Sequence, residues 1–444
     1  MIVEYNKRNH LLEEHTYKPS LQDVSRPNLH RQIFTYGKIP KIAFNMRHVP
    51  MECPKELYIS DTTFRDGQQA MEPFSVDNIV ELFKMLHRLG GKNGIIRQSE
   101  FFLYSDKDKD AVKKCLDLGY EFPEVTSWIR ANEKDFELVK EFGIKETGIL
   151  VSCSDYHIFK KMNMTRRQAM DKYLSVVKMA LDRGIVPRCH FEDITRADYF
   201  GFVVPFAIEL MRLSRESGIP IKIRACDTMG YGVTYPGTAM PRSVQGVIYG
   251  AGIIYGLQHY AGVPSEMLEW HGHNDFYKAV TNSATAWLYG CSTVNTTLLG
   301  IGERTGNTPL EAMAVEYASL RGTTNGMNLE VISEIADYFE DVMGYRIPPQ
   351  TPFVGKNFNV TKAGIHADGM LKDQEIYNIF DTQKILGRAP RVVVDSFSGL
   401  AGIAYWINSY YELPTENKVQ KSDDIVVKIK EFVDKEYALG RTTA

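Results

Sequence analysis

The chain has 444 residues, 44% of them hydrophobic, and carries 52 lysines and arginines against 55 aspartates and glutamates. This length can hold one large core and a smaller second unit. The near balance of charge gives no reason to expect nucleic acid or an anionic membrane surface as a partner, so we expect small molecules. The six cysteines form no CxxC pair, which fits a reducing cytoplasm.

The first 50 residues are polar, follow no clear period and contain four prolines. We interpret residues 1–50 as an N-terminal arm and not as a domain. Charged residues stand where a signal peptide would need an apolar run. The longest weakly polar stretch, Gly246 to Val263, is interrupted by glycines, Gln258 and His259, so we predict no membrane span.

From Leu57 onward, short apolar runs alternate with longer amphipathic stretches eight times before about residue 320. Strands that alternate with helices imply parallel pairing, and eight units over roughly 250 residues match a closed (β/α)8 TIM barrel. We assign the barrel to residues 51–322. A doubly wound open sheet is the alternative, but no GxGxxG follows the first strand. The predicted strands are 57–62, 94–100, 124–129, 146–152, 187–193, 221–227, 268–273 and 293–298, and the predicted helices include 76–90, 108–118, 134–142, 166–183, 203–218, 243–261, 277–290 and 309–321.

The alternating rhythm is lost after residue 322, and residues 323–444 read as a linker and small helical C-terminal subdomains. A helix around 328–343 leads into a proline-rich linker at 348–352. A glycine-punctuated loop at 363–369 follows and carries His366. This tail is too small to be a second catalytic domain.

Two histidines at the end of the seventh predicted strand mark the candidate site. Side chains alternate faces along a strand, so His271 and His273 point the same way and can share one divalent ion with carboxylates from elsewhere. After the first strand, Asp66 offers a carboxylate beside the cation of Arg65. In a barrel these strand ends share one face. The alternatives are a pair of hydrogen-bonded core histidines and a polar strand-to-helix loop.

A divalent metal can chelate the keto oxygen and carboxylate of a 2-oxo acid as a Lewis acid, and Arg65 would then stabilise the developing alkoxide. Thr228 and Arg196 are suitable carboxylate donors, although a capping threonine and an ion-paired surface arginine are alternatives. Further arginines suggest a strongly cationic barrel mouth that prefers a substrate with more than one carboxylate. They are Arg97, Arg130, Arg188 and Arg224.

Four of the cysteines fall in or near predicted strands or the last barrel turns. We interpret Cys153, Cys189, Cys226 and Cys291 as buried small residues, because no histidine and acid are arranged around any of them in the sequence.

Four motifs in order carry a family resemblance over residues 56 to about 405. The chain resembles the acyl-CoA-condensing metallolyases, which include isopropylmalate, homocitrate and citramalate synthases. The motifs are DTTFRDGQQ at 61–69, HGHND at 271–275, GIGERTGN at 300–307 and GIHADG at 364–369.

The resemblance implies a divalent metal held by Asp66, His271 and His273, with Asn307 near or in the shell. Mn²⁺ and Co²⁺ are the leading candidates, and Mg²⁺ and Zn²⁺ also tolerate such a shell. It further implies Arg65 as the electrostatic catalyst and Thr228 with Arg196 on the carboxylates of the oxo acid. His366 and Tyr377 match positions that assist proton transfer, usually in the active site of a homodimer partner.

Within this family, the stretches 97–104 and 188–193 resemble members that make citrate. We therefore expect an acyltransferase that converts the acyl group into alkyl on transfer: acetyl-CoA, oxaloacetate and water give citrate and CoA. Arg97 and Arg130 are expected at the substrate, and the catalytic base is open between His366 and Glu192. One alternative is a homocitrate or 2-isopropylmalate synthase that uses another 2-oxo acid. Another is a non-catalytic binder that keeps the barrel as a scaffold.

Overall fold

The computed structural model describes residues 2–6, 11–15, 19–27, 51–130, 133–234, 252–362 and 364–441. The chain divides into two compact units, Met1–Met327 and Asn328–Ala444. The predicted arm at 1–50 lies largely outside the described residues, apart from an antiparallel pair of strands, β1 (Ile2–Asn6) and β2 (Leu11–His15), and the segment 19–27. The predicted helix 243–261 lies partly outside them, and its described part is α6 (Ile253–His259).

The first unit contains a closed barrel of eight parallel strands, which confirms the predicted TIM barrel. Neighbouring strands follow the order β10-β3-β4-β5-β6-β7-β8-β9, so the last strand closes against the first. The strands are β3 (Tyr58–Asp61), β4 (Ile96–Phe101), β5 (Glu124–Ile129), β6 (Glu146–Ser152), β7 (Val186–Glu192), β8 (Lys222–Asp227), β9 (Leu268–Gly272) and β10 (Thr293–Thr296).

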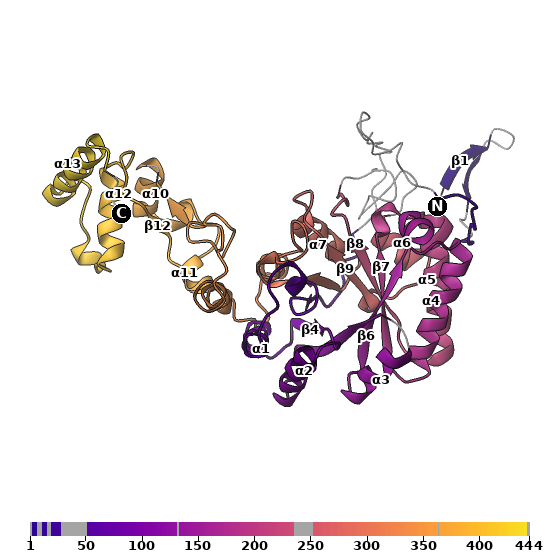
Figure 1. Cartoon of the computed structure of the whole chain (residues 1–444). Helices are drawn as coiled ribbons and strands as arrows, with labels where there is room; N and C mark the ends of the chain where they lie inside the picture. Colours follow the sequence, from indigo (N-terminus) through magenta and orange to yellow (C-terminus); the bar gives the residue numbers. More distant parts are fainter. Residues whose placement is uncertain are drawn as a thin grey trace. The chain divides into compact units, whose positions relative to one another are not determined.

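Helices surround the strands (Figure 1), and local capping explains several of their ends. Ser75 and Thr165 accept hydrogen bonds from first-turn amides, and Gly218 ends α5 in the left-handed conformation. Besides α6, the helices of this unit are α1 (Val76–Gly90), α2 (Asp106–Asp117), α3 (Glu133–Glu141), α4 (Arg166–Leu181), α5 (Val204–Ser217), α7 (Ala279–Leu288) and α8 (Leu310–Arg321), with shorter turns η1 (Gly67–Ala70), η2 (Tyr156–Lys161), η3 (Ile194–Arg196), η4 (Tyr199–Val203), η5 (Ser265–Met267) and η6 (Leu298–Gly300).

The interior of the barrel is charged, whereas barrel interiors are usually filled by branched apolar residues. Arg188 contacts Glu146 at 2.7 Å and Glu100 at 2.5 Å, while Arg224 contacts Glu269 at 2.8 Å and Glu100 at 3.1 Å. All five side chains are at most 5% exposed. The predicted cationic mouth is therefore wrong for Arg188 and Arg224, because buried carboxylates inside the barrel neutralise them.

Glu100 lies where these contacts converge. Burial would raise its pKa, but the guanidinium groups of Arg224, Arg188 and Arg65 hold the pKa well below its usual range. Glu100 is thus a carboxylate at neutral pH. The packing around it depends on a complete set of ion pairs, since an uncompensated buried charge is costly.

Gly148 on β6 makes room for this network. A Cβ at this position would lie 2.7 Å from Nε2 of His190, 2.9 Å from Cδ1 of Trp128 and 3.0 Å from Oε2 of Glu100. We expect Gly148→Ala to lower the free energy of unfolding by about 1–3 kcal/mol, because packed neighbours must shift. Thermal unfolding measures this loss. In the control Gly402→Ala the new methyl meets its nearest atom at 3.5 Å, and an equal effect there would contradict the explanation.

In the described residues of the second unit, helices are joined by one parallel pair of two-residue strands. Two small clusters of buried residues, one around Tyr405 and one around Ile403, form its interior. The predicted glycine-punctuated loop at 363–369 is wrong for most of its length, since residues 364–369 begin α10. The elements are α9 (Val331–Asp337), η7 (Tyr338–Val342), β11 (Val360–Thr361), α10 (Gly364–Lys372), η8 (Gln374–Ile376), α11 (Thr382–Leu386), β12 (Arg391–Val392), α12 (Leu400–Tyr410), η9 (Thr415–Asn417) and α13 (Asp424–Ala438).

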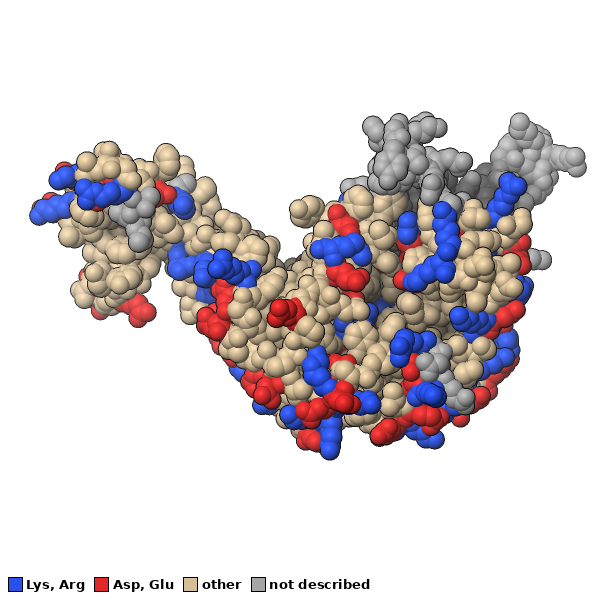
Figure 2. Space-filling view, viewed as in Figure 1, with Lys and Arg blue, Asp and Glu red and all other residues tan. Residues whose placement is uncertain are grey.

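On the surface in view, positive and negative side chains are interspersed over the barrel (Figure 2). Among the described residues, no helix combines the length and the apolar character that a membrane crossing needs. The four strand-associated cysteines, Cys153, Cys189, Cys226 and Cys291, are buried free thiols, as predicted.

Candidate metal centre and active site

Asp66, His271 and His273 meet at the carboxyl ends of the strands. Asp66 lies in the turn after β3, where its backbone N–H donates to the carbonyl oxygen of Thr62 at 2.8 Å. His271 belongs to β9, and His273 follows its end. The Nε2 atom of each imidazole lies 3.9 Å from Oδ2 of Asp66, and all three side chains are at most 8% exposed.

These separations suit a shared cation. They are too long for hydrogen bonds, yet shorter than twice the metal–ligand distance of about 2.1 Å. The ligand atoms of the three residues all lie within 4.8 Å of one another. A divalent cation therefore fits between them, and the group supplies the mixed nitrogen and oxygen donors that such ions accept.

The hydrogen bonds around the cluster also fit a metal. Nδ1 of His271 lies 2.8 Å from Oδ1 of Asn295, an acceptor, so this ring nitrogen carries the proton and Nε2 is free to ligate. Asn307 donates from Nδ2 to Oδ2 of Asp66 at 2.8 Å. Its own Oδ1 is buried and has no partner in the structure, so Asn307 can complete a metal shell through its oxygen.

The protonation states match metal binding. Burial lowers the pKa of His271 to about 3 and also lowers that of His273, so both imidazoles are neutral. Burial acts in the opposite direction on Asp66, but the guanidinium group of Arg65 brings the pKa of its carboxyl below the usual range. Neutral imidazoles and an ionised carboxylate are the ligand-competent forms.

Asn295 is a residue that the sequence did not single out, although it occupies a predicted strand. We expect Asn295→Ala to weaken Mn²⁺ binding about 10- to 100-fold, because the orientation and basicity of His271 depend on this hydrogen bond. Calorimetric titration of the metal-free protein measures the change. Asn78→Ala on the outer helix α1 is the control, and an unchanged affinity in Asn295→Ala would count against the assignment.

Arg65 lies between the metal cluster and the charged interior. Its Nε donates to Glu100 at 2.9 Å and its Nη1 to Asp66 at 3.2 Å. Its Cζ lies 5.8 Å from the ring centre of Trp128. The side chain is only 12% exposed, so the two carboxylates fix a guanidinium group next to the place where a metal-bound ligand would lie.

On the opposite side of the mouth, Asp193 organises the residues after β7 and β8. It accepts hydrogen bonds from Nε and Nη2 of Arg196 at 2.9 and 2.7 Å, and Cζ of Arg196 lies 4.2 Å from the ring centre of Tyr156. The backbone N–H of Asp193 donates to Oγ1 of Thr228 at 2.8 Å. The hydroxyl oxygen of Thr228 is thus an acceptor here, and its proton can be donated to a ligand.

Glu192 is held in place by η2. His157 approaches it at 3.1 Å and Lys161 at 3.8 Å, and Ser152 donates a hydrogen bond to its carboxylate. Burial alone would raise the pKa of Glu192, but the hydrogen bond and charge of His157 keep it below the usual value. A carboxylate with a lowered pKa is a weak base.

Arg97 and Arg130 are also predicted to lie at the substrate, and their positions differ from those of the residues above. The prediction that Arg97 lies at the substrate is wrong. Its side chain stacks between Tyr58 and Phe122, with Cζ 3.9 and 4.2 Å from their ring centres. It therefore lies near the amino ends of β3 and β4, away from the mouth. Arg130 follows β5 at the carboxyl end, lies over the ring of Tyr104 at 4.2 Å and is 65% exposed.

His366 and Tyr377 belong to the second unit. Their ring centres are 4.5 Å apart. Tyr377 is 45% exposed, and His366 is exposed as well. The structure thus brings these two predicted residues together as an accessible pair.

Arg304 ties three loops of the mouth together, although the sequence showed it only as part of a motif. Its Nε donates to Asp275 at 2.8 Å, and its Nη2 donates to the backbone oxygen of Thr228 at 2.5 Å. The loops after β8, β9 and β10 are joined in this way. No local sequence pattern predicts these contacts, because the partners of Arg304 lie 29 and 76 positions away in the chain.

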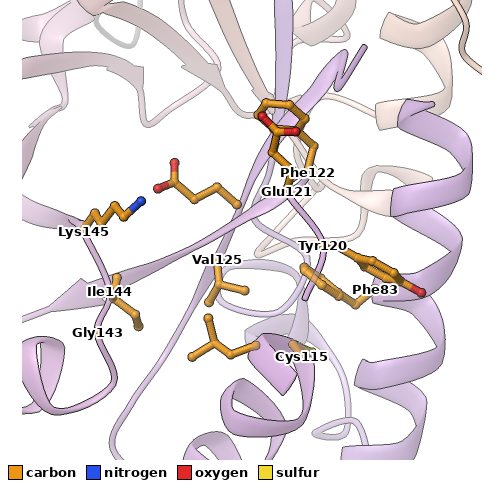
Figure 3. A pocket seen from close by; sticks show the side chains of 11 residues that line it. Phe83, Cys115, Tyr120, Glu121, Phe122, Val125, Gly143, Ile144 and Lys145 are labelled. Carbon is orange, nitrogen blue, oxygen red and sulfur yellow. The ribbon is translucent and has the colours of Figure 1, made fainter. Parts of the chain in front are cut away.

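A separate cavity of about 400 Å³ lies at the other end of the strands. Its lining includes Phe83, Tyr120 and Phe122 together with Lys145 (Figure 3). The residues just before β5 and β6 form part of its wall. Since catalysis in barrels of this kind takes place at the carboxyl ends, this cavity is not the candidate active site.

The fold and the site together define a class: a parallel barrel with a buried metal-binding cluster and an adjacent arginine at the carboxyl ends of its strands. The chain belongs to the HMGL-like family, whose model matches residues 56–339.

Comparison with named proteins shows which members of this family the chain is similar to. The chain is 59% identical to Citrate (Re)-synthase of Clostridium kluyveri, over 96% of this chain and 93% of that protein. It is 55% identical to Citrate (Re)-synthase of Syntrophus aciditrophicus, over 100% of this chain and 70% of that protein. Among solved structures, a hydroxymethylglutaryl-CoA lyase from Pseudomonas aeruginosa shares the fold at 19% identity and a TM-score of 0.51, covering 66% of this chain and 95% of that one.

Proposed function

We propose that this protein is a metal-dependent Re-face citrate synthase, which condenses acetyl-CoA with oxaloacetate and water to give citrate and CoA. The observation that carries the proposal is the cluster of Asp66, His271 and His273 beside Arg65 in a chain 59% identical to a Citrate (Re)-synthase. The facial stereochemistry rests on that relationship.

Asp66, His271 and His273 would hold the divalent ion, with Asn307 in or next to its shell. When bound, the ion supplies Lewis-acid polarisation of a keto oxygen. We propose Mn²⁺ or Co²⁺ as the native metal, with Mg²⁺ and Zn²⁺ as alternatives.

In the condensation, a base removes a proton from the methyl group of acetyl-CoA, and the resulting enolate carbon attacks the keto carbon of oxaloacetate. Arg65 directs its guanidinium at the keto oxygen, where negative charge develops. Water then cleaves the thioester, and CoA leaves as the thiol. The hydroxyl of Thr228 donates to a carboxylate of the oxo acid, while Arg196 acts through Asp193 by fixing Thr228. Arg130, at the rim, is a further candidate for contact with the substrates.

His366 is favoured as the base, with Tyr377 beside it. Glu192 is the weaker candidate, since His157 and Lys161 stabilise its ionised form. In the family that the chain resembles, the matching histidine and tyrosine usually act in the active site of the dimer partner, and this supports our proposal of a homodimer.

The test combines purified protein, Mn²⁺ and acetyl-CoA with oxaloacetate, 2-oxoglutarate or 2-oxoisovalerate, and measures the release of free CoA. We expect release with oxaloacetate and far less with the other acids. A labelled acetyl group should then appear in the arm of citrate that attack on the re face produces. Release only with 2-oxoglutarate or 2-oxoisovalerate would indicate a homocitrate or 2-isopropylmalate synthase, and no release with any acid would contradict the whole proposal.

A further inference from the structure

Trp128 lies at the carboxyl end of β5, directly across from Gly148 on β6. Alternation along β5 turns Trp128 to the interior, as it does Thr126, whose hydroxyl receives a hydrogen bond from Arg188. The Cδ1 edge of the indole lies over the space that Gly148 leaves, 2.9 Å from where a Cβ would be. The ring is partly exposed, so it lines the open end of the barrel.

This position borders the reacting groups. The Trp128 ring lies 5.8 Å from Cζ of Arg65 and packs edge-to-face on Phe102 at 5.7 Å. In the barrel order, β5 follows β3 and β4. Arg65 lies in the turn after β3, and Glu100 belongs to β4. A 2-oxo acid with its keto oxygen at Arg65 therefore has the indole as the wall on this side.

The indole nitrogen of Trp128 has no hydrogen-bond partner in the structure and is shielded from solvent. Indole nitrogen is only a donor, and a buried donor without an acceptor costs about 1–3 kcal/mol. Three arginines of the described barrel residues are engaged with carboxylates of the protein. Arg196 is paired with Asp193, and Arg188 and Arg224 are paired with buried glutamates.

We infer that Trp128 sets the length of the 2-oxo acid that the site accepts: its ring forms the wall beyond Arg65, and its N–H donates to the distal carboxylate of the substrate. The inference rests on the proposed function and names the residue that distinguishes oxaloacetate from longer acids. A site that hydrogen-bonds a substrate group discriminates more strongly than an apolar pocket does, because an unmet donor is left behind when that group is absent.

Two substitutions distinguish the role of the Trp128 N–H as a hydrogen-bond donor from the role of its ring as a wall of the site. Trp128→Phe removes the N–H and keeps an aromatic wall, so we expect the KM for oxaloacetate to rise about 10-fold while the KM for acetyl-CoA and the melting temperature stay near their wild-type values. Trp128→Ala removes the wall, so the kcat/KM ratio of oxaloacetate to 2-oxoglutarate should fall at least about 10-fold.

The control is Trp287→Phe. Trp287 is also a buried indole without a hydrogen-bond partner, but it packs on Tyr317 between α7 and α8. Its replacement should leave both KM values unchanged. Calorimetric titration of oxaloacetate into Mn²⁺-loaded protein, without acetyl-CoA, repeats the comparison without turnover.

The outcomes are distinguishable. An unchanged oxaloacetate affinity in Trp128→Phe, or an equal loss for every oxo acid in Trp128→Ala, overturns the inference. A lower melting temperature in Trp128→Phe with an unchanged KM would assign the residue a purely structural role and overturns it too. Failure of the proposed function would instead appear in the wild-type protein, as no CoA release with oxaloacetate.

Discussion

Replacing Arg65 by methionine is expected to lower kcat for CoA release about 1,000-fold, with little change in the KM for oxaloacetate. The charge on the keto oxygen develops only as the carbon–carbon bond forms, so the arginine stabilises the transition state more than the bound substrate. Its guanidinium group is held for this task by Glu100 at 2.9 Å and Asp66 at 3.2 Å. Steady-state assays with saturating acetyl-CoA measure the effect.

Arg65→Lys serves as the intermediate variant. It retains the charge but cannot hold both carboxylates in the same geometry, so we expect a loss between those of wild type and methionine. Arg212→Lys, in an exposed pair with Glu209 and Glu216 on α5, is the matched control. If Arg65→Met kept more than about a tenth of wild-type kcat, the electrostatic role would be wrong.

Glu146→Gln is expected to lower the free energy of unfolding by about 3 kcal/mol at pH 7. Glu146 is 4% exposed and contacts Lys222 at 2.5 Å and Arg188 at 2.7 Å. The neutral amide leaves the buried Arg188 and the partly buried Lys222 without their full counter-charge, which is more costly than the loss of a surface pair. Urea unfolding followed by far-ultraviolet circular dichroism measures the loss. Glu141→Gln, at the exposed end of α3, should change stability by less than about 0.5 kcal/mol.

The contribution of Glu146 to stability is also expected to depend on pH. Burial would raise the pKa of Glu146, but Lys222 and Arg188 lower it below its ordinary value of 4.5. A carboxyl with a depressed folded-state pKa stabilises the protein above its unfolded pKa, and the contribution is lost as the pH falls through the folded one. The stability difference between wild type and Glu146→Gln should therefore shrink below about pH 4.5. A constant difference down to pH 3 would contradict the ion-pair explanation.

Much of the barrel could be predicted from the sequence because alternation and strand length are local properties. All eight predicted strands overlap observed ones, and β5 and β6 agree at both ends. Alternation also indicates that His271 and His273 face the same way. The same alternation assigns Glu269, two positions earlier, to this face.

The depth of a side chain inside the barrel and the identity of its ion-pair partners could not be predicted in this way. Alternation assigns Arg188 and Arg224 to the interior but does not say how far below the mouth they lie or which acids meet them. Arg97 has the opposite parity to Gln98 and Glu100, so it faces outward. The approach of Asp66 to His271 depends on closure of the barrel, since β10 pairs with both β3 and β9.

The most direct test of the central claim is the stoichiometry of Mn²⁺ binding to the metal-free protein, measured by calorimetric titration for the wild type and for His273→Gln and Asp66→Asn. The three residues are predicted to form one site per chain, which either substitution should abolish or weaken at least about 100-fold, while circular dichroism shows the fold intact. Wild-type protein that binds no divalent ion, or variants that bind it as tightly as the wild type, would contradict the account.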